Sequence, residues 1–152
     1  MKTLAIKLQR MTWNAALMHR YGFLFLRYSL AIVFFWFGIL KPFGLSPAAD
    51  LIERTVFWFS SDWFIPFLGW WEVSIGLLMM SRRTVKYALI LLFLQIPGTF
   101  LPLIICPDIT FESFPFALSL EGQYIMKNLT LIAAAIAVGG TVNMRSNKEE
   151  IL

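Results

Sequence analysis

The sequence predicts an all-α membrane protein, a bundle of four transmembrane helices joined by short interfacial helices. Of its 152 residues, 59% are hydrophobic and 14% charged, whereas soluble domains average about 45–50% and about 25%. A soluble chain of this length has too little interior to bury that much apolar surface. The chain also contains four apolar runs long enough to cross a bilayer, which takes about 20 residues.

These runs divide the chain into three parts. The expected membrane domain is 21–142, with spans at about 21–40, 63–80, 85–105 and 123–142. Each span must be helical, because lipid offers no partner for open backbone groups. Residues 1–20 are expected to form a cytoplasmic interfacial helix, because their apolar side chains recur at helical spacing. Residues 143–152 form an expected cytoplasmic tail.

The charges between the runs predict the orientation. Lys and Arg gather in the N-terminal segment, in the Arg82–Lys86 turn and in the C-terminal tail, where Glu149 and Glu150 accompany them. The other two connections carry mostly Asp and Glu. By the positive-inside rule, both termini are expected in the cytoplasm, in a multi-pass protein of the inner (cytoplasmic) membrane.

The two acidic connections are expected to be ordered. Ser46 can cap a helix that begins at Pro47, and this helix would be amphipathic. The stretch 106–122 is rich in Pro and Phe and is expected to fold onto the mouth of the bundle. Pro66 is a plausible first-turn residue of the second span.

Charge and residue counts exclude several kinds of chemistry. The net charge is +4, but the basic residues lie between apolar runs, so we expect them to set topology rather than to bind nucleic acid. Cys106 is the single cysteine and His19 the single histidine. One chain therefore cannot form a disulfide, a thiolate metal site or the two histidine ligands of a b-type haem. No metal is expected.

Polar residues inside the spans are the candidate site. Such residues are costly in lipid and are functional hypotheses by default. Depth counted along the helices brings Arg27 and Glu72 close enough to pair, with Gln95 as a further member of this intramembrane cluster. The pair can simply pin two helices together, or it can form a polar site for a quinone head group, a proton or another polar ligand.

Further candidates lie near the outer ends of the spans. Lys41 and Lys127 can snorkel to the interface or face the interior and hold an anion. Trp70 and Trp71 precede Glu72 directly, so at least one of them must face inward, and Trp71 is a candidate ligand contact. Small residues on the fourth span, Ala133 with Ala137 and Ala135 with Gly139, predict close helix packing, inside the bundle or against a partner.

Several of these residues resemble the pattern of DoxX-like membrane proteins. The resemblance rests on Arg27, on Gly38-Ile39-Leu40-Lys41, on Trp71-Glu72 with Gly76, and on the stretch from Leu120 to Asn128. It covers residues 23 to 142 and implies a four-helix bundle with cytoplasmic termini. It also implies functional positions at Arg27, Gly38, Lys41, Glu72 and Gly76, of which the two glycines are expected at helix contacts.

Members of this family are linked to quinone-coupled thiosulfate oxidation and to membrane responses to oxidants. We therefore expect a non-catalytic accessory or scaffold subunit of a larger membrane redox complex, with lipid or quinone as ligand and no covalent cofactor. Its partners would be membrane lipids and other protein subunits, or further copies of itself. The alternatives are a subunit of a quinone-linked oxidoreductase of the thiosulfate–quinone type and a small-solute transporter that acts as an oligomer.

Overall fold

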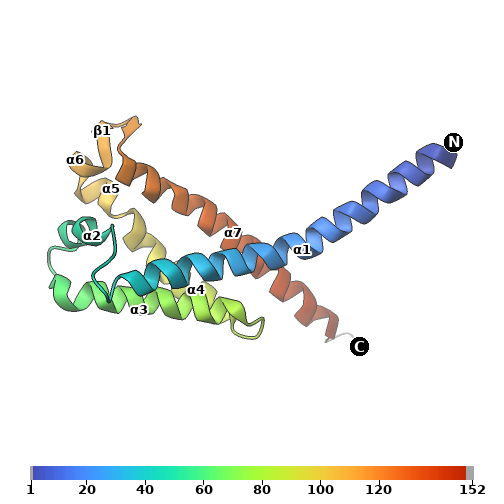
Figure 1. Ribbon diagram of the computed structural model, residues 1–152, viewed down its shortest axis with the longest axis horizontal. Helices are drawn as coiled ribbons and strands as arrows, with labels where there is room; N and C mark the ends of the chain where they lie inside the picture. The colour runs from blue at the N-terminus through green and yellow to red at the C-terminus, as the bar shows by residue number, and fades with distance from the viewer. Residues whose placement is uncertain (1, 150–152) are drawn as a thin grey trace.

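The computed structural model describes the backbone of residues 2–149 and the side chains of residue 15 and residues 17–141. This part of the chain forms seven helices and one two-stranded hairpin (Figure 1). In chain order they are α1 (Lys2–Leu40), α2 (Ala49–Thr55), α3 (Ser61–Met80), α4 (Val85–Phe100), α5 (Pro102–Ile105), α6 (Pro107–Thr110), β1 (Phe111–Ser113), β2 (Ala117–Leu118) and α7 (Leu120–Glu149).

The predicted set of membrane-length helices is confirmed. Four segments are long and apolar enough to cross a bilayer: Leu17–Leu40, Ser61–Met80, Val85–Ile105 and Leu120–Thr141. Together they define a multi-pass membrane protein. The first two and the last lie on α1, α3 and α7, and the third comprises α4 and α5. Figure 1 shows α3 running along α1 and α7 crossing α1 obliquely, and the N-terminal part of α1 extends past the other helices.

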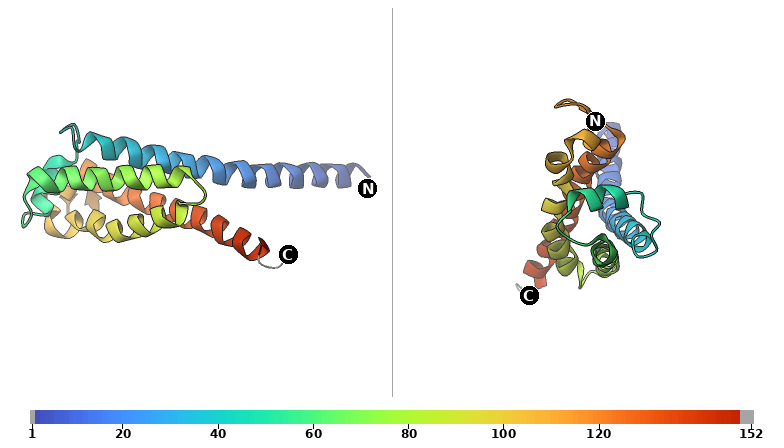
Figure 2. Two further views of the ribbon diagram at one scale, coloured as in Figure 1. Left: turned by 90° about the horizontal axis from the view of Figure 1, so that it is seen from below. Right: turned by 90° about the vertical axis from the view of Figure 1, so that its left-hand side faces the viewer.

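The bundle is a ring in which each long helix packs on two neighbours. The contacts run α1 on α3, α3 on α4, α4 on α7 and α7 back on α1. Figure 2 shows α7 diverging from α1 toward the C-terminus. The core contains small and branched side chains from all four helices, among them Leu30, Ile75, Ala88 and Ala135.

Glycines bring α1 and α3 into direct backbone contact. A Cβ built on Gly76 would lie 2.7 Å from the backbone nitrogen of Phe35 and 2.8 Å from the carbonyl oxygen of Ala31. A Cβ on Gly38 would lie 2.8 Å from the carbonyl oxygen of Gly69. Close packing of this kind holds helices together where lipid gives little hydrophobic driving force between them. Gly38 and Gly76 are thus packing residues, as expected, and Gly69 joins them.

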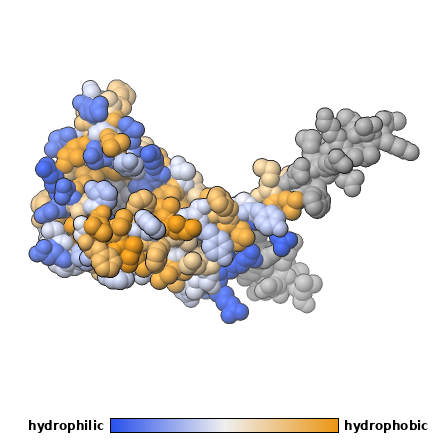
Figure 3. Space-filling model, viewed as in Figure 1, coloured by the Kyte–Doolittle hydropathy of each residue, from blue (hydrophilic) through white to orange (hydrophobic). Residues whose placement is uncertain are grey.

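The surface of the bundle matches a membrane environment. Figure 3 shows hydrophobic residues across the helical middle and hydrophilic residues near both ends of the part that is coloured. Many large apolar side chains point outward, including Phe25, Ile32 and Phe93. In water such a surface would be an aggregation hazard, whereas lipid covers it without cost.

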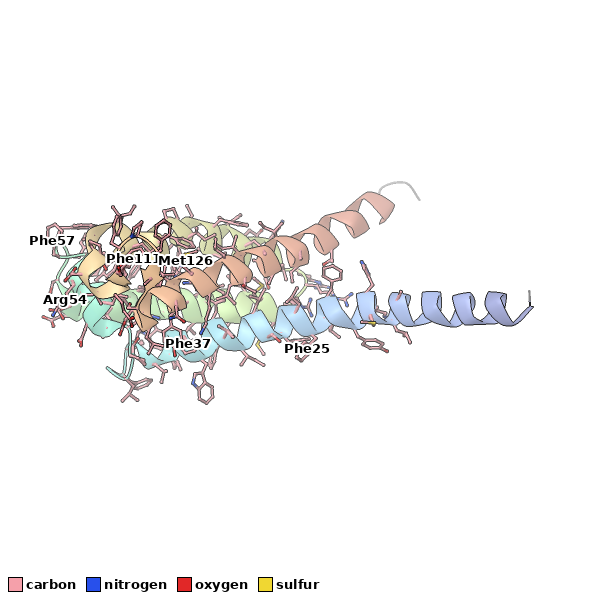
Figure 4. The ribbon with its side chains drawn as sticks, turned by 90° about the horizontal axis from the view of Figure 1, so that it is seen from above. Phe25, Phe37, Arg54, Phe57, Phe111 and Met126 are labelled. Carbon is pink, nitrogen blue, oxygen red and sulfur yellow. The ribbon has the colours of Figure 1, made fainter. Side chains whose placement is uncertain are left out.

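A cap of short elements covers one end of the bundle. In Figure 4, Arg54, Phe57 and Phe111 gather at this end, and Phe25 lies far along α1. A Cβ on Gly122 would lie 2.1 Å from the carbonyl oxygen of Thr110, so only glycine lets α6 pack this closely on α7. The stretch 106–122 is therefore folded and packed on the bundle, as predicted.

Two predicted details at helix ends are wrong. The helix expected from Pro47 begins at Ala49 without a side-chain cap, because 47–48 form a turn in which the Ser46 carbonyl, not its hydroxyl, accepts from Ala49 N. Pro66 lies inside α3, where its missing N–H removes a bond only near the helix start. The third span keeps its predicted bounds, and a single turn residue, Leu101, separates α4 from α5 within it.

The backbone has no break between the N-terminal segment and the first span. The backbone of α1 continues as one helix from Lys2 through residue 20 into the first span. The predicted apolar face of residues 2–19 falls mainly on side chains outside the described residues. The composition change at residue 20 therefore marks no break in secondary structure.

Replacing Gly76 with Ala tests the α1–α3 contact. The added methyl group would push into the backbone of α1, and overpacking of this kind costs about 1–3 kcal/mol of stability. We expect a lower thermal midpoint of helical circular dichroism in detergent. Gly22→Ala is the matched control, because nothing lies within 4 Å of its Cβ position and Ala favours the helix by about 0.5–1 kcal/mol. Equal midpoints for the two variants would contradict the packing described here.

Candidate functional site

Glu72 is the centre of a polar cluster inside the bundle. One carboxylate oxygen, Oε2, accepts a hydrogen bond from Lys41 Nζ in a buried ion pair. The other, Oε1, accepts a hydrogen bond of 2.7 Å from Gln95 Nε2. The exposed fractions of the Lys41 and Glu72 side chains are 7% and 11%. Three separate segments, the end of α1, α3 and α4, are thus joined through one carboxylate.

Local backbone structure places both members of the ion pair. Lys41 directly follows the last residue of α1, where the helix dipole favours a positive charge. Its Nζ also lies 3.5 Å from the carbonyl oxygen of Phe37. The Gly38–Gly69 contact brings the two helices close enough for Lys41 to reach the carboxylate one turn further along α3.

Trp71 fixes α3 against α4 beside the cluster. Its indole Nε1 donates a hydrogen bond of 3.2 Å to the carbonyl oxygen of Leu91. Trp71 is half-buried and packs on the core, whereas Trp70 is exposed. The prediction that at least one of these two tryptophans faces inward is confirmed.

A pocket of about 130 Å³ adjoins the cluster. It lies between α1, α3, α4 and α7, and polar and apolar side chains both contribute to its wall. The polar members are Glu72, Gln95, Thr99 and Asn128. The apolar members are Phe34, Leu92, Ile96, Phe100, Leu131 and Ile132.

The size and lining of this pocket suit a small ring with polar substituents. An apolar cavity of about 150 Å³ is known to hold one benzene molecule, so the space matches a single six-membered ring. Ligand sites in proteins are mostly apolar, with a few polar groups that fix orientation. The pocket has this character, and its polar groups come from three different helices.

The predicted Arg27–Glu72 pair is wrong. Arg27 is buried, but its Nε has no hydrogen-bond partner among the described residues, and its guanidinium lies 4.9 Å from the centre of the Tyr28 ring. Gly38 lies beside Glu72, and eleven residues separate Gly38 from Arg27. At about 1.5 Å per residue, Arg27 is therefore about 16 Å further along the bundle. Lys41 takes its place.

Lys41 and Lys127 do not face each other. Lys41 is buried on Glu72, whereas Lys127 is exposed on α7, with Nζ 4.5 Å from the centre of the Tyr124 ring. The two lysines therefore share no anion site. Lys41 therefore faces the interior of the bundle, and Lys127 lies on its surface.

The small residues of α7 divide between two faces. Ala135 is fully buried, and a Cβ on Gly139 would meet the Leu89 side chain at 2.9 Å. This pair packs inside the bundle. Ala133, in contrast, is exposed and Ala137 is half-buried, so the Ala133–Ala137 pattern makes no comparable internal contact and stays open to a partner.

Sequence reasoning did not assign Phe34, Thr99 or Asn128 to the site. A threonine or asparagine within an apolar run is a weak signal, because either can serve a local backbone hydrogen bond. Their meeting in one pocket depends on the relative rotation of α4 and α7. That rotation is a property of the packed bundle.

Comparisons of the chain with protein-family models, with curated proteins and with solved structures gave no match. The resemblance to DoxX-like proteins accordingly stays a prediction. Within the part of the chain that the structure describes, no three His, Cys, Asp or Glu residues gather as a metal-binding group.

Substitutions of the Lys41–Glu72 pair are expected to be strongly non-additive. Lys41→Met leaves a buried carboxylate without its cation, and Glu72→Gln leaves a buried ammonium; breaking such pairs costs about 3–5 kcal/mol. The double variant removes both charges and should recover most of the loss. Chemical unfolding in detergent measures the four free energies of unfolding.

Lys127→Met is the matched control for this cycle, because it removes the same group from an exposed position. It should change the free energy of unfolding by less than about 1 kcal/mol. Additive losses in the double variant would show that the two side chains act independently, which the geometry does not allow.

Proposed function

We propose that this protein is a DoxX-like subunit of a membrane redox complex, and that its bundle holds the polar head of a quinone or lipid. The observation that carries the proposal is the pocket beside the Lys41–Glu72–Gln95 cluster. In this assignment the chain binds and positions a ligand, and other subunits carry out electron transfer.

The mixed wall of the pocket supports an amphipathic ligand. Glu72, Gln95, Thr99 and Asn128 supply hydrogen-bonding groups, and the remaining wall is aliphatic and aromatic. A molecule that is apolar throughout would leave the buried Gln95 Oε1 without a partner, at a cost of about 1–3 kcal/mol. A ring with oxygen substituents meets both kinds of wall.

The residue inventory supports a role without its own redox centre. One histidine and one cysteine are too few to bind a b-type haem through two histidines or an iron–sulfur cluster through thiolates. Cys106 is also buried in the cap, with Sγ 3.9 Å from Thr55 Oγ1. Electrons for a bound quinone would then come from a partner subunit.

The arrangement of the resemblance residues favours a DoxX-like assignment. Gly38 and Lys41 are far in sequence from Glu72 and Gly76, yet all four lie along the contact between α1 and α3. The two glycines set the close approach of the helices, and the other two form the buried ion pair. A shared structural role of this kind is a physical reason for such a pattern.

The distribution of charge supports cytoplasmic termini in an inner membrane. Acidic residues lie on α2, at the start of α3 and α7, and on α6 and β1, all at the capped end of the bundle. Arg82, Arg83 and Lys86 lie at the other end, at the turn between α3 and α4. By the positive-inside rule the second end faces the cytoplasm.

Cysteine labelling tests this orientation. In a Cys106→Ser background, Ser60→Cys and Ser81→Cys place one thiol at each end of α3, at exposed positions. A membrane-impermeant maleimide should label the Ser60→Cys variant in intact spheroplasts and the Ser81→Cys variant only after the membrane is opened. The reverse pattern would place the termini outside.

Filling the pocket tests the binding role. Leu131→Trp adds volume to the pocket wall, whereas Leu129→Trp makes the same change at an exposed position of the same helix. After purification in mild detergent, mass spectrometry of lipids and proteins should find quinone or a defined lipid bound to the wild type. Leu131→Trp should reduce its amount per chain severalfold, and Leu129→Trp should not.

The same preparation tests the accessory role, because redox subunits should co-purify in fixed ratio with the wild type. A chain that elutes alone with quinone bound would favour a quinone-reducing subunit instead. Equal ligand content in both tryptophan variants would contradict binding in the pocket.

A further inference from the structure

We infer that the pocket selects a head group that donates hydrogen bonds, so that it binds a quinol or another neutral alcohol in preference to a quinone. This inference rests on the proposed function and names the chemical form of the ligand. A quinone carbonyl can only accept a hydrogen bond, whereas a quinol hydroxyl can also donate one. The donors and acceptors of the pocket wall determine which of the two ligands can form all its hydrogen bonds.

The orientation of the Gln95 amide is the first step of the argument. One carboxylate oxygen of Glu72 accepts a hydrogen bond from Lys41, and the other accepts one from Gln95. An ionised carboxylate can only accept hydrogen bonds. The amide group that faces it must therefore be the NH₂. This leaves Gln95 Oε1 as an acceptor, and this atom is buried and has no partner among the described residues.

The neighbouring hydroxyl does not supply the missing donor. Thr99 Oγ1 donates its hydrogen to the backbone carbonyl oxygen of Gln95 at 3.3 Å, not to Gln95 Oε1. The hydroxyl of Thr99 can therefore only accept a further hydrogen bond. Glu72 belongs to the same wall, and its ionised carboxylate can only accept. Asn128 can donate or accept and is compatible with either form of a ligand. The free hydrogen-bonding capacity of the other three polar residues of the wall is therefore that of acceptors.

The charge of the cluster favours a neutral donor over a cation. Lys41 already balances the charge of Glu72, and the two side chains are almost fully buried. A second cation would bring an uncompensated charge into an apolar region, which is strongly unfavourable. A hydroxyl group satisfies Gln95 Oε1 without changing the net charge.

Paired redox forms of one small ring test the inference. Durohydroquinone and duroquinone share a ring and its methyl groups and differ in donor capacity. Anaerobic calorimetric titration of the full chain in detergent should show binding of the hydroquinone on the order of tenfold tighter, the value of about one hydrogen bond. This comparison needs no variant, so a folding defect cannot obscure it.

Two variants then assign the preference to its residue. A single Gln95→Met change would free Glu72 Oε1 as a new acceptor. The Lys41→Met/Gln95→Lys double variant instead keeps one cation on the Glu72 carboxylate and removes the amide acceptor, so it should abolish the preference. Gln123→Lys makes the same change at an exposed position of α7 and should keep the preference. Persistence of the preference in a folded double variant would overturn the role assigned to Gln95.

The remaining outcomes separate this inference from the proposed function. Equal or tighter binding of duroquinone would overturn the donor preference and leave the binding role intact, whereas binding of neither form would overturn both. Competition by 1-dodecanol distinguishes two sources of hydroxyl. Displacement of the hydroquinone at equal concentration would support a lipid alcohol as ligand, and failure to displace it would support a quinol.

Discussion

The buried pair between Lys41 and Glu72 is the constraint on which the bundle depends. Each charge alone would be unacceptable inside an apolar helix pack, so each side chain requires the other. The pair fixes the end of α1 on α3, and Gln95 extends the same carboxylate to α4. One carboxylate therefore links three of the four helices, and the pocket lies directly beside it.

Two further features make this pair possible. Glycines at positions 38, 69 and 76 let α1 and α3 approach at backbone distance, which sets the register that places Lys41 against Glu72. The cap then closes the same end of the bundle, where Gly122 admits the backbone of Thr110. Packing between small residues and pairing between charges thus act on the same contact between helices.

Much of the fold could be predicted from the sequence, because apolar length is a direct requirement of the bilayer. The four long helices, the ordered stretch 106–122 and the polar pair of Glu72 with Gln95 follow from hydropathy and from the cost of polar groups in apolar runs. The partner of Glu72 could not be predicted in this way. Depth counted from assumed helix ends favoured Arg27, whereas glycine contacts between helices set the true register.

The glycine contact also limits which helices can shift relative to one another. Backbone contact and a buried ion pair lock α1 to α3, so these two helices must move as one body. Gln95 and Trp71 tie α4 to the same body by hydrogen bonds to α3. α7 contributes Asn128, Leu131 and Ile132 to the pocket wall, and the contact between Gly122 and Thr110 holds its first turn on the cap. A change in the width of the pocket would therefore require α7 to pivot about its capped end.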